Sequence, residues 1–375
     1  MKRLLSFAAL IGLVISTPVL AEYGLNFPEP ATPVATEIKD IHNLTMIIST
    51  VLLVIVFTIV FYSLFTHRKS RGFEPDQEFH KGTFGKWSWV LVPVTVLGVD
   101  LTIADSAQSV LEKVWIAPNE EMIEIKVVGH QWWWEFVYLT EGGVKVESRI
   151  LSKKDLADRG QPENLYLRAV DNHLKLPVGK NVKFLHTSDD VLHAFWVPAL
   201  GMKKDAIPGY IQETWIDGIY KEGIYRGQCA EMCGTKHAFM PIVVEAVSEQ
   251  AFATWIAEKK VARDKAIAEA NSNKTWTKDE LMAKGKTSYD KKCAACHKVD
   301  GSGGGPFPKL AGSPMATTGS IADHMNIVLK GKGVMPAWAS SMDDLELAAV
   351  VTYERNAWGN DTGDVIQPKD VKASR

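Results

Sequence analysis

Two cysteines and a histidine near the C-terminus carry the most specific chemistry in this chain of 375 residues. Cys293, Cys296 and His297 stand in a Cys-x-x-Cys-His spacing. Each thiol can add to a vinyl group of haem, and the adjacent imidazole then lies under the iron as its proximal ligand. A redox-active pair or half of a zinc site would use the same two cysteines. The two other cysteines, Cys229 and Cys233, belong to a separate loop with its own ligand set and so are not left to complete the zinc, and no βαβ pattern surrounds the motif. The spacing therefore predicts a covalent c-type haem.

An electron-transfer haem needs a second axial ligand, and a methionine raises its reduction potential. Met335 follows a glycine-rich stretch and precedes Pro336, which would hold it in place. Met315 is a weaker candidate because it lies in a turn-like segment nearer the haem motif. We therefore predict His297 and Met335 as the axial pair.

The remaining cysteines lie in one short loop that combines thiolate, imidazole and thioether groups: Cys229, Cys233, His237 and Met240. Thiolate with thioether favours copper, whereas zinc rarely takes methionine. The loop has one cysteine more than a mononuclear blue-copper loop, and two thiolates can bridge two copper ions. A further histidine is then needed: His193 is the first candidate and His186 the second. The alternative is a Cys229–Cys233 disulfide with Met240 as a core residue.

The N-terminal third has the composition of a membrane anchor. Residues 1–21 have the pattern of a signal peptide cleaved after Ala21, although a third span is the alternative. Residues 44–65 carry no charge, are long enough to span a bilayer, and precede a basic cluster that belongs in the cytoplasm. Residues 87–103 form a weaker span that contains Pro93 and Asp100. Asp100 is either a functional carboxylate or a solvated residue near the outer interface.

This topology places everything after the second span outside the cytoplasm, where haem attachment and copper sites are expected. The sequence thus predicts a multi-pass protein of the bacterial inner membrane with periplasmic domains. The formal net charge of −2 argues against a nucleic-acid partner.

Residues between 120 and 247 alternate in short runs separated by turn residues, which predicts an antiparallel β-sandwich or barrel. The expected strands are 122–138, 144–150, 164–170, 182–188, 211–217 and 223–229. A helix over 249–270 follows, and a capping box at Thr277 opens another over 281–291. A last helix over 343–356 completes an all-α region. We expect the boundaries 1–21 (signal peptide), 22–110 (membrane hairpin), 111–248 (β-domain), 249–275 (linker), 276–360 (haem domain) and 361–375 (tail).

The copper loop and the segment 129–134, which contains three consecutive tryptophans, resemble subunit II of the haem-copper cytochrome c oxidases. The resemblance covers the signal peptide, both spans and the β-domain, while the C-terminal part is similar to a class I cytochrome c. This is the caa-type arrangement. It implies a cupredoxin fold that holds binuclear copper A, with Cys229 and Cys233 as bridging thiolates. It further implies His193 and His237 as terminal ligands, and Met240 and the Glu231 carbonyl as weak axial ligands.

The resemblance also implies roles outside the copper ligands. The Glu231 carboxylate would help to bind magnesium shared with subunit I, and Trp132 would receive electrons from cytochrome c. Asp189 and Asp190 match an acidic patch near the docking surface. Three adjacent tryptophans also alternate faces on a strand, so at least one is expected in the core.

One position departs from the family. A carboxylate often precedes the second span and is thought to admit protons, but Lys86 stands there. Upstream carboxylates could substitute (Glu74, Asp76 and Glu78). We assign no residue to proton uptake.

The functional hypothesis is subunit II of a terminal cytochrome c oxidase. Electrons would pass from a donor to haem c, to copper A and to the haem of subunit I, where oxygen is reduced. The partners would be subunit I, other oxidase subunits and a cytochrome c or another donor. Alternatives are a copper A subunit of a nitric oxide reductase and a membrane-anchored copper carrier. Nitrous oxide reductase shares the copper loop but is normally soluble.

Overall fold

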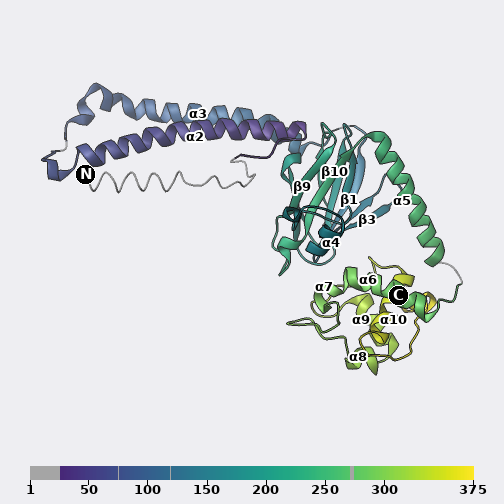
Figure 1. The fold of residues 1–375 in the computed structure, drawn as a ribbon. Coiled ribbons are helices and arrows are strands. Elements are labelled where there is room, and N and C mark those ends of the chain that lie inside the picture. Colours follow the sequence, from purple (N-terminus) through teal and green to yellow (C-terminus); the bar gives the residue numbers. More distant parts are fainter. Residues whose placement is uncertain (1–25, 75, 119, 271–273) are drawn as a thin grey trace.

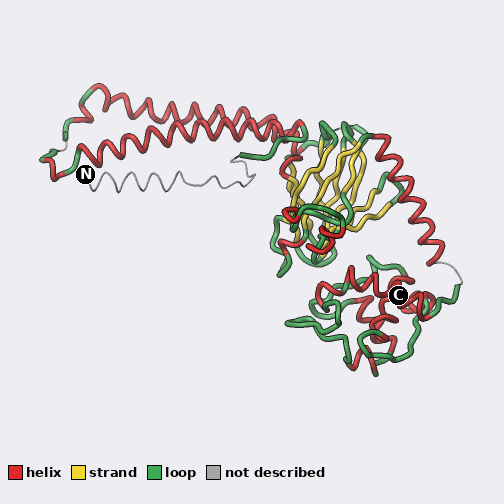
Figure 2. The backbone as a smooth tube through the Cα atoms, viewed as in Figure 1, coloured by secondary structure: helices red, strands yellow, loops and turns green. Residues whose placement is uncertain are grey.

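The computed structural model describes residues 26–74, 76–118, 120–270 and 274–375. They form a helical hairpin, a β-sandwich and a C-terminal helical region (Figures 1 and 2). This confirms the predicted fold class. The expected signal peptide lies outside the described residues, so its cleavage stays a prediction.

The hairpin consists of α2 (Pro33–Thr66) and α3 (Thr83–Trp115), both apolar and long enough to cross a membrane. At 1.5 Å per residue each extends about 50 Å, well beyond a hydrocarbon core of about 30 Å. Both helices therefore contain the predicted spans and continue past them. The short helices η1 (Lys69–Arg71) and η2 (Phe79–Lys81) lie between them. Lys86 and Asp100 are exposed on α3, and both readings of Asp100 stay open.

The hairpin is attached to one end of the sandwich. The side chain of Thr32 caps α2 by accepting from the Ala35 amide at 3.2 Å, and its hydroxyl donates to the Leu200 carbonyl at 3.1 Å. Gly201 has φ +68°, and a Cβ there would lie 2.9 Å from the Ala35 Cα. At the end of α3, the Trp215 indole donates to the Lys113 carbonyl at 2.9 Å. Side-chain hydrogen bonds to backbone carbonyls at both helices, together with the close approach of Gly201 to Ala35, therefore fix the hairpin to the β-domain.

The sandwich has two five-stranded sheets, in the orders β3-β2-β1-β5-β8 and β4-β10-β9-β6-β7. The first contains β1 (Ile123–His130), β2 (Trp133–Tyr138), β3 (Val144–Ser148), β5 (Val182–Ser188) and β8 (Gln212–Ile216). The second contains β4 (Leu174–Pro177), β6 (His193–Val197), β7 (Met202–Ala206), β9 (Gly223–Cys229) and β10 (Pro241–Val247). Most neighbours are antiparallel as predicted, but β1–β5 and β4–β10 are parallel.

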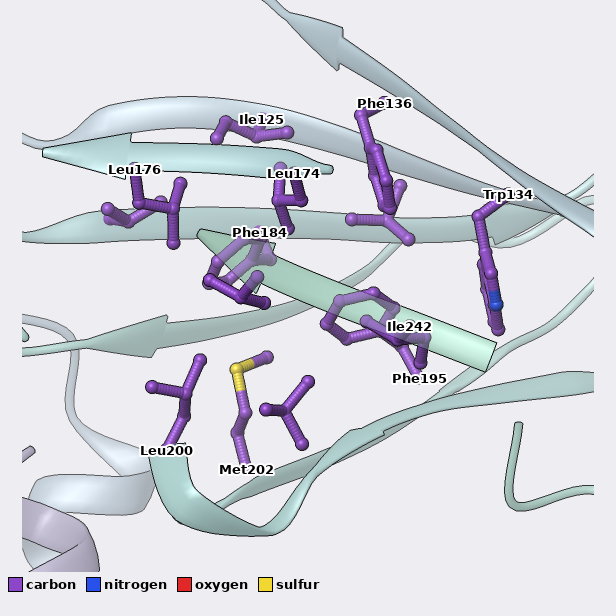
Figure 3. Packing of buried hydrophobic residues seen from close by; sticks show 14 of the residues in the cluster. Ile125, Trp134, Phe136, Leu174, Leu176, Phe184, Phe195, Leu200, Met202 and Ile242 are labelled. Atoms are coloured by element: carbon purple, nitrogen blue, oxygen red, sulfur yellow. The ribbon is translucent and has the colours of Figure 1, made fainter. Parts of the chain in front are cut away.

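Aromatic and aliphatic side chains from both sheets fill the space between them (Figure 3). Trp134 and Phe136 alternate along β2 and meet Phe195 of β6, with ring centroids 5.4 Å and 6.2 Å apart. The period of two puts every second residue of β2 into this core. Trp133, on the opposite face of β2, is also buried but belongs to a separate cluster.

The predicted strand over 164–170 is wrong. Its residues form the short helix η3 (Glu163–Leu165) and a turn in which Leu167 has φ +67°. Leu165 and Tyr166 pack against Leu156 of α4 (Lys153–Asp158). The apolar residues of this segment therefore belong to a small satellite cluster and not to a strand. Conversely β4, β6, β7 and β10 were not predicted. Most of β10 is buried, and such a strand lacks polar alternation.

The predicted linker helix is confirmed as α5 (Glu249–Ala270). Its first turns pack on the sandwich, where the rings of Trp255 and Tyr138 lie 5.4 Å apart. The helix follows the side of the β-domain before it reaches the C-terminal region (Figure 1).

The C-terminal region contains α6 (Lys278–Lys292), α7 (Ala294–His297), α8 (Pro314–Thr317), α9 (Ile321–Lys330), α10 (Asp344–Asn356) and α11 (Pro368–Ser374). The capping box at Thr277 and Glu280 is present. Residues 361–375, expected as a tail, include α11, whose Val371 is fully buried in the core of this region. We call residues 123–247 the copper domain and residues 276–375 the haem domain, because each contains one predicted site.

Gly285 allows α6 and α10 to approach closely, since a Cβ there would lie 2.1 Å from the Ala349 carbonyl oxygen. We expect Gly285→Ala to destabilise the haem domain by about 1–3 kcal/mol through overpacking, although helix propensity alone favours alanine by about 1 kcal/mol. Hydrogen–deuterium exchange of α6 and α10 in the intact chain measures this.

The matched control is Gly98→Ala in α3, where a Cβ meets nothing within 4 Å. The exchange rate of α3 in Gly98→Ala should equal that of the parent or be slower. If α6 were equally protected from exchange in Gly285→Ala and in the parent, the close approach of α6 and α10 at Gly285 would be contradicted.

Candidate copper and haem sites

The loop between β9 and β10 carries the sulfur groups, and strand pairing brings the distant histidine to it. Cys229 ends β9 and lies opposite Phe195 of β6, while His193 is the first residue of β6. The Ala230 amide donates to the Ala194 carbonyl at 3.0 Å and extends this pairing into the loop. Residues 36 positions apart in sequence therefore meet at one end of the sheet.

The donor atoms lie at separations typical of ligands that share a metal. The sulfurs of Cys229 and Cys233 are 3.9 Å apart, and Cys229 is 3.9 Å from His193 Nδ1. The Cys233 sulfur is 3.6 Å from His237 Nδ1 and 3.4 Å from the Met240 sulfur. Tetrahedral ligands at bond lengths of about 2.0–2.3 Å are about 3.3–3.8 Å apart. A disulfide requires about 2.05 Å, so that alternative is wrong.

The two imidazoles each approach a different sulfur. His193 lies beside Cys229 and His237 lies beside Cys233, an arrangement that suits two metal ions bridged by two thiolates. The Cys229 thiol also lies 3.3 Å from the Glu231 carbonyl oxygen. All six residues predicted around the copper thus lie together, and the ligand atoms of His193, Cys229 and Cys233 fall within 4.8 Å of one another.

Asp190 orients the His193 ring. Its carboxylate accepts from His193 Nε2 at 2.8 Å and from the Gln131 and Val191 amides at 2.7 Å and 2.6 Å. With Nε2 as donor, the lone pair of Nδ1 faces Cys229, which is the usual arrangement for a carboxylate behind a metal-bound histidine. The Asp190 side chain is only 8% exposed, so its predicted place in an acidic surface patch is wrong. Asp189 beside it is exposed.

The two thiols are electrostatically coupled. The hydrogen bond with Cys233 lowers the pKa of Cys229 to about 3, and the same bond together with burial raises the pKa of Cys233. Cys229 therefore loses its proton more readily than an ordinary thiol, and Cys233 retains its proton more strongly. A soft cation that binds both sulfurs displaces that proton.

Gly129 of β1 provides the space for His193. A Cβ at this position would lie 2.7 Å from the His193 ring carbon Cδ2. The second histidine candidate, His186, is wrong: it is buried in the sandwich and its Nε2 bonds the Thr214 hydroxyl at 2.8 Å. Burial lowers the pKa of His186 to about 3, which keeps this core imidazole neutral.

The three tryptophans have three different environments. Trp134 lies in the sandwich core, as expected for at least one of them. The Trp132 indole donates to the Cys233 carbonyl at 3.1 Å, and the Gln131 side chain donates to the same oxygen at 2.8 Å. Trp133 lies under the Arg149 guanidinium, 3.9 Å from the ring centroid. Trp132 therefore supports the copper loop directly.

His297 in the haem motif is buried, and its Nδ1 lies 2.8 Å from the Pro308 carbonyl oxygen. This bond fixes the ring with Nε2 free to ligate iron. Cys293 and Cys296 are free thiols at the two ends of one helical turn, and burial raises the pKa of both. The residues fit a covalently attached haem.

A tight turn holds Met335, in which its amide and carbonyl both bond Lys332 at 3.1 Å. Gly331 begins this turn with φ +75°, and a Cβ there would lie 2.5 Å from the Met335 carbonyl oxygen. Met335 packs against the same buried cluster as Cys293. Met315 lies in α8. The choice of Met335 over Met315 as the axial ligand stays a prediction.

We expect Asp190→Asn to weaken metal binding at the loop about 10–100-fold, because an amide no longer holds the His193 ring as a carboxylate does. Titration with a competing chelator measures the affinity. Asp189→Asn removes the same charge from the adjacent exposed residue and should leave the affinity unchanged. Equal losses in the two variants would contradict the orienting role of Asp190.

Family models match three parts of the chain. The periplasmic domain of cytochrome c oxidase subunit II matches residues 123–247, and its transmembrane domain matches residues 21–104. The model described as cytochrome c oxidase, cbb3-type, subunit III matches residues 280–353.

Individual proteins agree with these matches. A probable cytochrome c oxidase subunit 2 of Rickettsia felis is 33% identical over 259 residues, which cover 68% of this chain and 79% of that protein. Cytochrome c oxidase subunit 2 of Cereibacter sphaeroides is 30% identical over 251 residues, which cover 63% of this chain and 80% of that protein. The crystal structure of the subunit II periplasmic domain of Bradyrhizobium japonicum is 38% identical and covers 39% of this chain and 99% of that one, with a TM-score of 0.35.

The family models divide at the same places as the fold: the hairpin, the β-sandwich with its cysteine loop, and the helical region with the haem motif. The domains imply binding of copper and of haem c. The chain belongs to the cytochrome c oxidase subunit II family, carries a C-terminal cytochrome c domain, and is a component of an oxidase complex.

Proposed function

We propose that this subunit relays electrons from a donor, through covalent haem c and binuclear copper A, to the haem of subunit I in a terminal respiratory oxidase. The observation that carries the proposal is the pair of thiols 3.9 Å apart, each beside a different histidine. The same chain contains the Cys-x-x-Cys-His motif. Oxygen reduction takes place in subunit I.

In the proposed copper centre, Cys229, Cys233, His193 and His237 would hold the copper ions. Met240 and the Glu231 carbonyl, which contact the two thiols, would supply weaker ligands. The copper pair supplies one-electron redox chemistry when bound. Both cysteines, His193 and Met240 are at most 3% exposed, so the surrounding protein excludes water and holds the ligands in place.

The residues around the centre divide the remaining tasks. The Glu231 carbonyl faces Cys229, which leaves its carboxylate available for a magnesium ion shared with subunit I. Trp132, bonded to the Cys233 carbonyl, is the proposed route by which electrons reach the copper. In the haem domain, His297 and Met335 would hold the iron.

The proposed location is the bacterial inner membrane with both cofactor domains in the periplasm. The apolar faces of α2 and α3 are exposed in the isolated chain, as expected for helices that meet lipid and subunit I. The external donor is a cytochrome c or another one-electron carrier.

The proposed function is tested by Cys229→Ser in the purified complex. We expect the parent to hold about two coppers per chain, with one unpaired electron shared by both nuclei, and to consume oxygen with a reduced donor. The variant should lose this signal and the oxygen consumption, because serine does not bridge copper. Copper analysis, electron paramagnetic resonance and an oxygen electrode measure these effects.

Met232→Leu changes an exposed residue of the same loop, 71% accessible, and is the control. It should retain copper and activity. A single labile copper in the parent would favour a copper carrier, and consumption of nitric oxide in place of oxygen would favour a nitric oxide reductase.

We expect Met335→Leu to lower the haem reduction potential by on the order of 0.1 V or more, because the iron loses its thioether ligand. The methionine–iron absorption band should disappear. Met315→Leu is the matched control and should change neither property. The reverse pattern would assign the axial role to Met315.

A further inference from the structure

A buried lysine joins the haem domain to the copper domain. Lys292, the last residue of α6, has a side chain only 2% exposed. Its ammonium lies 2.7 Å from the Glu147 carboxylate of β3 and 3.4 Å from the Glu346 carboxylate of α10, and it donates to the Ser341 carbonyl at 2.8 Å. A cation removed from water in this way requires such partners. Glu147 is its acidic partner from the other domain.

The two carboxylates differ in how readily they stay charged. Burial alone would raise the pKa of Glu147, but the cations of Lys292 and Arg149 outweigh it and lower this pKa. For Glu346, burial dominates and raises the pKa. The ion pair between the domains is also the shorter of the two, at 2.7 Å against 3.4 Å.

Beside this pair, aromatic and cationic groups form a continuous stack. The Arg149 guanidinium bonds Glu147 at 3.3 Å and lies over the Trp133 ring at 3.9 Å. The His130 ring also stacks on Trp133, with centroids 3.9 Å apart and planes inclined by 4°. Trp133 shares its buried cluster with Cys293 of the haem domain. The copper domain thus contributes an aromatic side chain to the haem-domain core.

The interface continues to the copper loop. Lys236 of that loop donates to the Ala295 carbonyl within the haem motif, and Ser340 donates to Asp189 at 3.1 Å. Cys296 and Phe307 pack against the core of the copper domain. Trp132 is only 9% exposed. The docked haem domain therefore lies over the face that contains both tryptophans.

We propose that Lys292 latches the haem domain to the copper domain through Glu147, and that the latched state closes the Trp132–Trp133 face to any separate haem protein. The inference rests on the proposed relay and specifies its donor: a soluble one-electron carrier meets the haem domain and not the copper domain.

The latch is tested by Glu147→Lys in the full-length protein loaded with haem and copper. The substitution places a cation opposite Lys292 and Arg149. We expect hydrogen–deuterium exchange of residues 292–297 and 147–151 to rise about tenfold or more, since the domains separate when a buried pair is broken. Copper content should be unchanged, which shows that the copper domain remains folded.

Glu213→Lys is the matched control. Glu213 lies on β8, at the opposite edge of the same sheet, and pairs with Lys183 of its own domain at 3.0 Å. Exchange at residues 292–297 should match that of the parent. No change in Glu147→Lys, or equal changes in both variants, overturns the latch.

The closure is tested by adding a zinc-substituted class I cytochrome c, which transfers no electrons in the dark. The result therefore does not depend on the proposed relay. We expect protection of residues 130–134 from exchange only in Glu147→Lys. Equal protection in the parent would show that the face is open to a separate haem protein and would overturn the closure.

Discussion

Two buried thiols held 3.9 Å apart are the constraint on which the rest of the structure depends. Two thiolates at this distance repel each other, and the hydrogen bond between the thiols moves their pKa values in opposite directions. The fold must therefore supply cation ligands and exclude water. The pairing of β6 with β9 brings His193 to Cys229, Gly129 leaves space for the imidazole, and Asp190 fixes its orientation. The Gln131 and Trp132 side chains bond the Cys233 carbonyl and secure the loop from the other side.

The second requirement is that the two redox sites lie close together in one chain. A tether alone raises the local concentration of one domain near another. Here the contacts go further: α5 packs along the sandwich, and Trp133, Arg149 and Glu147 form a surface that receives α6 and α7. A docked arrangement fixes distance as well as concentration. The hairpin is bonded to the other part of the β-domain through Thr32 and Trp215, so the copper loop keeps one position relative to the membrane helices.

The sequence predicted the parts whose signal is local. The haem motif, the capping box at Thr277 and α5 depend on neighbouring residues, and the copper loop contains most of its ligands within twelve positions. His193 was inferred from its place after a strand. The wrong and missed predictions have long-range causes. The alternating apolar residues of 164–170 pack in a satellite cluster, and β10 is so buried that its residues do not alternate between polar and apolar. Asp190 was misread as a surface charge because its burial depends on His193. From the sequence, Lys292 is indistinguishable from other lysines at helix ends. Its partner Glu147 belongs to the other domain, so their contact could not be predicted.

The central claim is that electrons pass from the haem to the copper within one chain. Rapid injection of less than one electron per molecule, followed by absorbance at the haem and copper bands, tests it most directly. The account predicts that haem is reduced first and then reoxidised as copper is reduced, at a rate independent of protein concentration. A rate proportional to protein concentration, or copper reduction without reoxidation of the haem, would contradict it.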